Sequence, residues 1–303
     1  MLSSWICQQP VRFQPVLMRI VAKHGARVLI VLLLGGFLGA TLVRFAPGFG
    51  VDEQELDSRL SRESLEHLRQ VRGAPESLGA FYVHYLGRML RGDLGMSRTL
   101  EQPVSQLLAE RFPETCKSVV LGLLLGWTLG LSFAVIAVFS RNWCVDLLAN
   151  LAAGALLCVP AAVLAILFVM AQAPSRLVLG LVVFPKVFRY SRNLLGRAAA
   201  LPHVLTARAK GLGGARILLW HVLPVTAPQL LALAGISVSA ALAAAIPVEV
   251  LCDLPGIGQL AWKAALGRDF ELLINLTMIV TVITLLANSA ADLVRQPQRA
   301  GAA

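Results

Sequence analysis

Side chains that could carry out chemistry are few in this sequence of 303 residues, and they lack the spacing that catalysis or metal binding needs. The histidines are scattered, at positions 24, 67, 84, 203 and 221, and the five cysteines include no C-x-x-C pair. No Gly-Lys dipeptide occurs, so the chain has no phosphate-binding P-loop. Residues 256–261 match the dinucleotide pattern G-x-G-x-x-[GA], but no strand pattern precedes them. We therefore expect a protein that is not an enzyme, with no catalytic residue, no bound cofactor and no metal site.

The most informative polar stretch is a basic segment at residues 201–224. Its sequence predicts a short helix, a glycine-rich break at 211–214, and a second helix from Ala215 to His221 that leads to Pro224. A compact helical knob of this kind suits insertion into a groove on a cytoplasmic partner, although a basic loop held at the lipid headgroups has the same composition. The candidate partner-binding residues are Thr206, Ala207, Arg208, Ala209, Lys210, Gly211, Leu212, His221, Leu223 and Pro224.

The composition places this segment in a membrane protein. Hydrophobic residues make up 57% of the chain and charged residues only 15%, whereas about a quarter of the residues of a soluble domain are charged. The net charge of +10 is typical of a nucleic-acid-binding protein only when it lies on a soluble module. We therefore expect contact with membrane lipids and no nucleic-acid partner.

Apolar runs between charges predict six membrane-spanning helices. Runs 118–140, 147–175, 222–248 and 272–291 are at least as long as the roughly 20 residues that a span needs. Run 28–43 is shorter, and 177–190 is interrupted by Lys186 and Arg189. A cleaved signal peptide is the alternative for the first run, but no small-x-small cleavage site follows it, which favours an uncleaved anchor. The predicted all-α polytopic fold has spans at 28–46, 118–140, 147–171, 177–191, 225–248 and 272–292.

The basic residues predict the orientation of these spans. They cluster in the N-terminal arm, residues 1–27, and again in the connection at 186–216, which the positive-inside rule places in the cytoplasm together. An even number of crossings must separate the two clusters, so the weak segment at 177–191 is required to cross. The core then extends over 117–294, the 47–116 loop is extracytoplasmic, and both termini, including the tail at 295–303, are cytoplasmic.

Two further patterns concern helix packing. Apolar residues between Leu78 and Leu90 recur at helical spacing and predict an amphipathic helix, either an extracytoplasmic docking surface or a helix lying on lipid or on the bundle. Glycines repeat at every fourth position, 35 and 39 in the first span and 122, 126 and 130 in the second. Small residues at this spacing indicate close helix packing, within one bundle or in a dimer.

The last span carries a polar face formed by Thr277, Thr281, Thr284 and Asn288, followed by Asp292. This face either lines a translocation path or forms hydrogen bonds between and within helices. The interiors of the strong spans contain no carboxylate, which an ion-coupled carrier usually needs. The energy source is therefore expected on another chain.

Several motifs together resemble one family. The segment from Leu205 to Gly211, followed by His221-Val222-Leu223-Pro224, resembles the E-A-A-x-x-x-G…L-P loop of ABC-importer permeases and specifically the dipeptide/oligopeptide (peptide/nickel) family. Further resemblances follow the family's order along the chain: residues 44–48, the G-D-L-G-x-S signature at 92–97, Phe-Pro-Glu-Thr at 112–115, the E…P-G-x-G-x-L element at 249–260, and Arg-Asp-Phe at 268–270.

The resemblance implies an inner-membrane permease subunit of a prokaryotic, binding-protein-dependent importer for peptides or a related small solute, including nickel-type substrates. It implies partnership with a second homologous permease, two cytoplasmic ATPase subunits that hold ATP and Mg²⁺, and an extracytoplasmic solute-binding protein. The 201–224 segment would couple the ATPases to transport by alternating access. Glu249, Pro255, Gly256 and Gly258 would form an extracytoplasmic gate or re-entrant element.

The sequence also departs from the family pattern. The glutamate position of the E-A-A motif is Leu205 and the position of its first alanine is Thr206. These departures leave two alternatives open, a degenerate or export-type ABC permease and a membrane enzyme or assembly factor that has no ATPase partner.

Overall fold

The computed structural model describes residues 91–97, 99–140 and 142–295, together with isolated residues at 25, 26, 30, 33, 34, 41, 87 and 88. The predicted first span at 28–46 and the amphipathic helix at 78–90 thus lie largely outside the described residues. The described part is helical, with only an isolated β-bridge between Met96 and Pro103. Its helices are α5 (Val104–Phe139), α6 (Trp143–Cys158), α7 (Ala161–Met170), α8 (Leu177–Ala199), α9 (Pro202–Ala209), α10 (Gly214–Ile217), the π-helical η1 (Leu218–Val222), α11 (Leu223–Leu251), α12 (Ile257–Leu266) and α13 (Phe270–Arg295).

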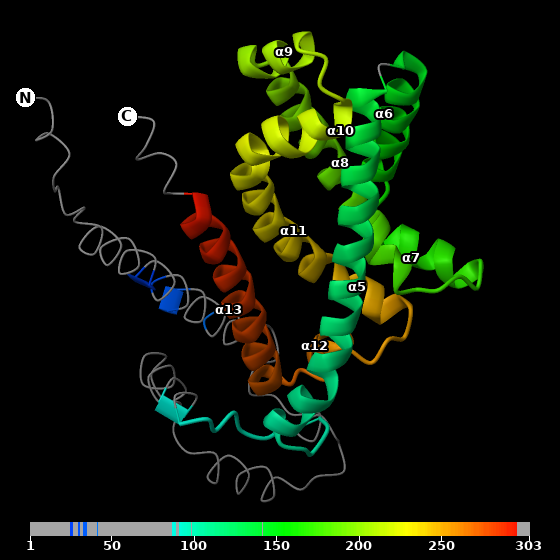
Figure 1. The fold of residues 1–303 in the computed structure, drawn as a ribbon. Helices are drawn as coiled ribbons and strands as arrows, with labels where there is room; N and C mark the ends of the chain where they lie inside the picture. Colours follow the sequence, from blue (N-terminus) through cyan, green and yellow to red (C-terminus); the bar gives the residue numbers. More distant parts are fainter. Residues whose placement is uncertain are drawn as a thin grey trace, which may run out of the picture.

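Helices α5 and α8 lie side by side and run in the same direction (Figure 1). The buried side of α5 is a stripe of small residues that includes Gly122, Gly126 and Gly130. A Cβ atom built on Gly126 would lie 2.7 Å from the Cβ of Val183, and one on Gly130 would lie 2.9 Å from the Cβ of Val187. The predicted close packing is therefore found within this chain, between the glycines of α5 and the branched side chains of α8.

Helix α8 buries one face and exposes another. Val183, Val187 and Phe188 are fully or almost fully buried, whereas Lys186 and Arg189 are exposed. The low hydropathy of this segment thus reflects charges confined to one side of a helix whose other side packs on α5 and α11.

The predicted segment 147–171 covers two helices rather than one. Helix α6 ends at Cys158, and α7 begins at Ala161 in a direction 97° away. Proline 160 has no N–H to continue α6, and it favours the extended backbone found at Val159 (φ −88°, ψ 119°). The sequence prediction did not include this break.

Helix α11 lies at the centre of the bundle and contacts α5, α7, α8, α12 and α13. Its contact with α13 is close, because a Cβ on Gly235 would lie 2.6 Å from the Cβ of Ala291. The amide Nδ2 of Asn288 on α13 donates to Ser239 Oγ on α11 at 2.9 Å. This hydrogen bond ties the two helices within their apolar length.

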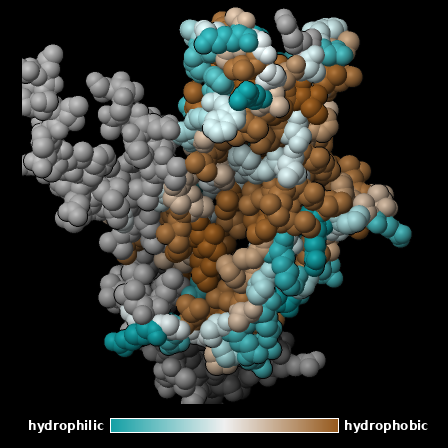
Figure 2. All heavy atoms as spheres, in the orientation of Figure 1, coloured by the Kyte–Doolittle hydropathy of each residue, from teal (hydrophilic) through white to brown (hydrophobic). Residues whose placement is uncertain are grey.

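The described helices form a bundle with an apolar middle and two polar ends. Three of them are long and apolar enough to cross a bilayer, Val104–Phe139, Gly214–Leu251 and Glu271–Ala291, and the bent pair of α6 and α7 is a further candidate. The surface is hydrophobic over the middle of the molecule and hydrophilic toward both ends (Figure 2). We name these ends the α9 end and the α12 end, after the short helix found at each (Figure 1).

We predict that Gly126→Ala destabilises the bundle. The added methyl group would meet Val183 Cγ1 at 2.7 Å and the backbone oxygen of Gly180 at 3.1 Å, so overpacking should cost about 1–3 kcal/mol. Thermal unfolding in detergent, followed by tryptophan fluorescence, measures the change.

The matched control is Gly154→Ala in α6, where no atom lies within 4 Å of the added Cβ. There the higher helix propensity of alanine should stabilise by up to about 1 kcal/mol. Equal unfolding temperatures for the two variants would contradict the proposed role of the α5–α8 contact.

Candidate functional site

At the α12 end, a buried carboxylate lies at the start of α12. The Glu249 side chain belongs to the last turn of α11 and is 1% exposed. Its Oε2 accepts a hydrogen bond from the backbone N–H of Gly258 at 2.6 Å. Thr115 Oγ1, from α5, accepts another from the backbone N–H of Ile257 at 2.8 Å. Two of the N–H groups that a helix leaves unpaired at its N-terminus are thus satisfied by side chains of other helices.

The two glycines of this element provide the space for the carboxylate. A Cβ on Gly256 would overlap the carboxylate of Glu249, and one on Gly258 would lie 2.6 Å from Ile246 Cα. Pro255 is exposed in the turn that reverses the chain between α11 and α12, with its ring constraining the backbone just before Gly256. The structure therefore brings together Glu249, Pro255, Gly256 and Gly258, the residues singled out from the sequence.

An apolar cavity of about 100 Å³ adjoins this junction. It lies between α5, α11, α12 and α13, and Thr115, Ile257 and Gly258 belong to both the junction and the cavity wall. Most of the other lining residues are aliphatic or aromatic, and Cys116 adds a thiol. A shift of α12 would thus change both the hydrogen bonds of the junction and the shape of the cavity.

A second buried carboxylate joins the segment 91–103 to the turn between α12 and α13. The Asp269 side chain is 1% exposed, and its Oδ2 accepts hydrogen bonds from Ser97 Oγ at 2.6 Å and from the backbone N–H of Thr99 at 3.2 Å. Its Oδ1 accepts from the backbone N–H of Leu272 in the first turn of α13 at 3.1 Å. Sequence reasoning quoted the segments of Ser97 and Asp269 separately but did not pair them.

Glu271 and Asn275 of α13 extend this contact. Glu271 Oε1 forms an ion pair with Arg88 Nη2 at 3.0 Å, and Asn275 Nδ2 donates to the backbone oxygen of Leu94 at 2.9 Å. Gly95 has a positive φ of 75° and lies directly against the Glu271 side chain. The G-D-L-G-x-S signature is therefore attached to α13 at several points.

At the α9 end, the segment 201–224 begins with the two-turn helix α9. Val204 and Ala207 are buried against the bundle, while Thr206, Arg208 and Lys210 are exposed. Thr206 Oγ1 donates to the backbone oxygen of Pro202 at 2.9 Å, within the helix. Ala207, one of the predicted partner-binding residues, thus packs α9 against the bundle. Thr206, Arg208 and Lys210, which belong to the same predicted set, are accessible to a partner.

Gly211 ends α9 with a left-handed backbone. Its φ is +76°, its N–H donates to the backbone oxygen of Arg208 at 3.0 Å, and the N–H of Leu212 donates to that of Ala207 at 3.3 Å. This pair of bonds is the Schellman arrangement at a helix C-terminus. No atom lies within 4 Å of a Cβ built on Gly211, so the requirement for glycine is conformational.

The second predicted helix, Ala215 to His221, is formed by a short α-helix and a π-helical turn. Helix α10 spans Gly214–Ile217, and η1 continues without a break into α11. Pro224 has no N–H and therefore cannot bond to the carbonyl one turn earlier. The N–H of Leu223 donates to the backbone oxygen of Leu218, five residues back, which is the spacing of a π-helix. His221 lies in this turn, and its backbone oxygen is 3.4 Å from His203 Nε2 on α9.

A hollow lies at the α9 end between the ends of α5 and α8 and the helices α9 and α10. We call it the arginine hollow, since the charged residues in its lining are Arg192, Arg197 and Arg208. The rest of the lining consists of Asn193 and of apolar or small residues, among them Phe139 of α5, Leu205 of α9 and Ile217 of α10.

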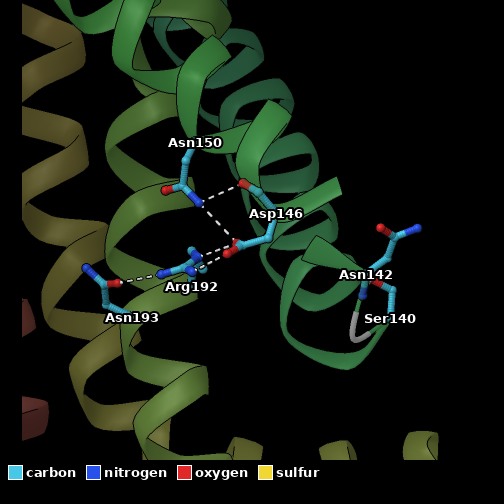
Figure 3. A network of polar contacts seen from close by, with 6 residues as sticks. All are labelled: Ser140, Asn142, Asp146, Asn150, Arg192 and Asn193. Carbon is cyan, nitrogen blue, oxygen red and sulfur yellow. Dashed lines mark hydrogen bonds and ion pairs between the residues drawn. The ribbon is translucent and has the colours of Figure 1, made fainter. Parts of the chain in front are cut away.

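One of these arginines already has an acidic partner. Arg192 Nε donates to Asp146 Oδ1 at 2.6 Å and its Nη2 donates to Asp146 Oδ2, which joins α8 to the first turn of α6 (Figure 3). Asn150 Nδ2 donates to the same Asp146 Oδ1 at 3.0 Å. The charge of Arg192 is therefore compensated within the chain.

The polar face of α13 makes mostly local hydrogen bonds. Thr277 Oγ1 donates to the backbone oxygen of Ile274 at 2.9 Å, and Thr281 Oγ1 donates to that of Thr277 at 2.7 Å. Asn288 bonds to Ser239 on α11, as described above. Thr281, Thr284 and Asn288 are only partly exposed, whereas Thr277 is exposed. These contacts are hydrogen bonds within and between helices, which is the second of the two alternatives that the sequence left open for this face.

The described residues contain no group of three or more His, Cys, Asp or Glu side chains that could hold a metal ion. Their conspicuous polar contacts join one helix to another, at both ends of the bundle.

Comparison with known proteins gives one family. A family profile described as "Binding-protein-dependent transport system inner membrane component" matches residues 122–298. The chain is 25% identical to the di/tripeptide transport system permease protein of Pseudomonas aeruginosa (strain UCBPP-PA14), over 86% of this chain and 93% of that protein. It is 30% identical to the oligopeptide transport system permease protein of Escherichia coli K12, over 66% and 72% respectively. It is 24% identical to a probable peptide ABC transporter permease protein of Sinorhizobium fredii NGR234, over 90% and 95%.

We predict that Thr115→Val loosens the attachment of α12. The substitution keeps the shape of the side chain but leaves the buried N–H of Ile257 without its acceptor, which should cost about 1–3 kcal/mol. Thermal unfolding in detergent measures the loss.

Thr128→Val in the same helix is the control, because the exposed Thr128 hydroxyl bonds only to Leu124 and Leu125 of its own helix. The assignment of Thr115 as a helix cap fails if both variants unfold at the wild-type temperature.

Proposed function

Since the chain belongs to the family of binding-protein-dependent transport system inner membrane components, it is the permease subunit of an ABC importer, and we propose that it carries peptides or a related small solute. The names of the three relatives described above, all of peptide transport systems, support this substrate class. The proposal includes small nickel-type solutes. As a transporter subunit, the chain leaves ATP hydrolysis to other subunits of the system.

We propose six spans, five of them formed by α5, the α6–α7 pair, α8, α11 and α13, with the first preceding the described helices. The α9 end would face the cytoplasm of a prokaryotic cell, and both termini would lie on that side. This orientation is supported by Arg192, Arg197, Arg208, Lys210 and Arg216, all of them at the α9 end. Exposed Trp143 and Trp220 at this end suit the membrane interface.

The complex would contain a second homologous permease, two ATPase subunits that hold ATP and Mg²⁺, and a solute-binding protein outside. In this arrangement, α9 and the following turn dock on an ATPase, and closure of the ATPases on ATP moves them. Small Ala207 and Ala209 and the Schellman turn at Gly211 support docking, since they give a compact and well-defined helix.

The observation that carries the proposal is the continuity of α11. This 29-residue helix follows η1 directly at the α9 end and ends beside Glu249 and α12 at the opposite end. At 1.5 Å per residue it is about 43 Å long, enough to connect both surfaces of a membrane. A displacement of the coupling segment would therefore reach α12 through one continuous helix, and α12 would act as the extracytoplasmic gate.

We expect the wild-type chain to co-purify in mild detergent with co-expressed ATPase and second permease, and Gly211→Val to lose the ATPase. Valine at a φ of +76° is strained, so the end of α9 should rearrange. Gly213→Val adds the same side chain in the same loop at a φ of −63°, also with open space around it, and should keep the ATPase.

Absence of the ATPase from the wild-type complex would contradict the assembly. Retention of the ATPase by the Gly211 variant would contradict only the role given to α9.

For the gate, we expect Pro255→Ala to reduce solute uptake by reconstituted complexes while assembly and basal ATP hydrolysis persist. Loss of the proline ring frees the exposed turn that directs Gly256 and α12 toward Glu249. Uptake of a labelled peptide supplied with the binding protein is the measurement. Wild-type uptake by the variant would remove Pro255 from the gate.

A further inference from the structure

The arginine hollow has an excess of positive charge facing solvent. Arg197 on α8 and Arg208 on α9 are both exposed, and neither guanidinium group forms a hydrogen bond or ion pair within the described part of the chain. Arg192 is compensated by Asp146, and the described residues that line the hollow include no carboxylate. Among the residues that the structure describes, two guanidinium groups from two different helices thus have no anionic partner.

Leu205 explains why this charge is uncompensated. It lies three residues before Arg208, so both side chains lie on the same face of α9, and both line the hollow. Leu205 occupies the position of the glutamate in the E-A-A motif. A carboxylate at this position would lie beside Arg208, whereas the half-exposed leucine leaves the guanidinium free.

We propose that the arginine hollow receives an acidic side chain of the ATPase subunit, which takes the place of the carboxylate that position 205 lacks. The inference rests on the proposed docking of α9. A guanidinium group binds a carboxylate through two parallel hydrogen bonds, so the hollow selects Asp or Glu. The location favours a protein partner, because α9 lies at the outer end of the bundle, beyond the apolar middle of the molecule (Figures 1 and 2).

The test uses the assembled permease pair in nanodiscs of zwitterionic phosphatidylcholine, titrated with purified ATPase subunit. Arg197→Glu and Arg208→Glu should each weaken binding at least about tenfold, and added salt should weaken wild-type binding more than that of the variants. Arg216→Glu is the matched control, since Arg216 is exposed on α10, undergoes the same charge reversal, does not line the hollow and is not among the predicted partner-binding residues.

Leu205→Glu provides an independent arm. The new carboxylate would pair with Arg208 and compete with the partner, so ATPase binding should weaken. Stronger binding would instead mean that Leu205 is a defect repaired by the family residue, and would overturn the proposal. Arg208→Gln removes the charge without reversing it and should fall between Arg208→Glu and wild type, which covers misfolding of the reversed variant.

The remaining outcomes distinguish the proposal from its alternatives. Equal binding by Arg208→Glu and Arg216→Glu would overturn the proposal while leaving docking of α9 intact, whereas no binding by wild type would contradict the proposed function itself. An effect of Arg208→Glu that appears only when the nanodiscs contain anionic phosphatidylglycerol would assign the hollow to a lipid headgroup. Restoration of binding to Arg208→Glu by one Asp- or Glu-to-Lys substitution in the ATPase would identify the inserted residue.

Discussion

The contact between the glycine stripe of α5 and the branched side chains of α8 is the constraint on which the rest of the bundle depends. Between helices in a bilayer, apolar burial supplies little driving force, so association relies on close packing. Gly122, Gly126 and Gly130 allow that closeness, and they let α8 bury its apolar face despite carrying Lys186 and Arg189 on the other. Because α8 is held in this way, its C-terminal turns present Arg192 to Asp146 of α6 and position α9 over the end of the bundle.

Backbone N–H and C=O groups that lack a hydrogen bond are costly near a membrane, and this cost explains the structure at both ends of α11. At the α9 end, Pro224 removes a donor, and the π-helical turn adjusts the bonding before α11 continues. At the α12 end, the chain reverses and starts a new helix, whose first N–H groups are satisfied by Glu249 and Thr115 from neighbouring helices. Both ends of one long helix are therefore joined to short helices by specific polar contacts. This is the arrangement expected if motion at one end is to reach the other without unfolding either connection.

Local patterns in the sequence predicted much of this organisation. The apolar runs fall on α5, α8, α11 and α13, although α5 begins at Val104, well before its run at 118–140, and the glycine pattern indicated a close helix contact. The motif around Glu249 and Gly258 already contained the carboxylate and the two glycines that meet in space. What could not be predicted depends on distant pairing. Ser97 and Asp269 are 172 positions apart, and the partner of the glycine stripe could have been a second chain. The bend between α6 and α7 was missed because Pro160 lies inside an uninterrupted apolar run, where hydropathy gives no signal.

The distribution of charge connects these observations. Two buried carboxylates at the α12 end are used internally, since Glu249 caps α12 and Asp269 caps α13 and holds the 91–103 segment. At the α9 end, the one carboxylate whose side chain the structure describes is Asp146, and it neutralises a single arginine. The α12 end is thus held together by two buried carboxylates, whereas the side chains of Arg197 and Arg208 at the α9 end form no hydrogen bond or ion pair within the described part of the chain. If the ATPase subunit docks at the α9 end, as proposed, the guanidinium groups of Arg197 and Arg208 are available to bind it, because no acid of the described chain neutralises them.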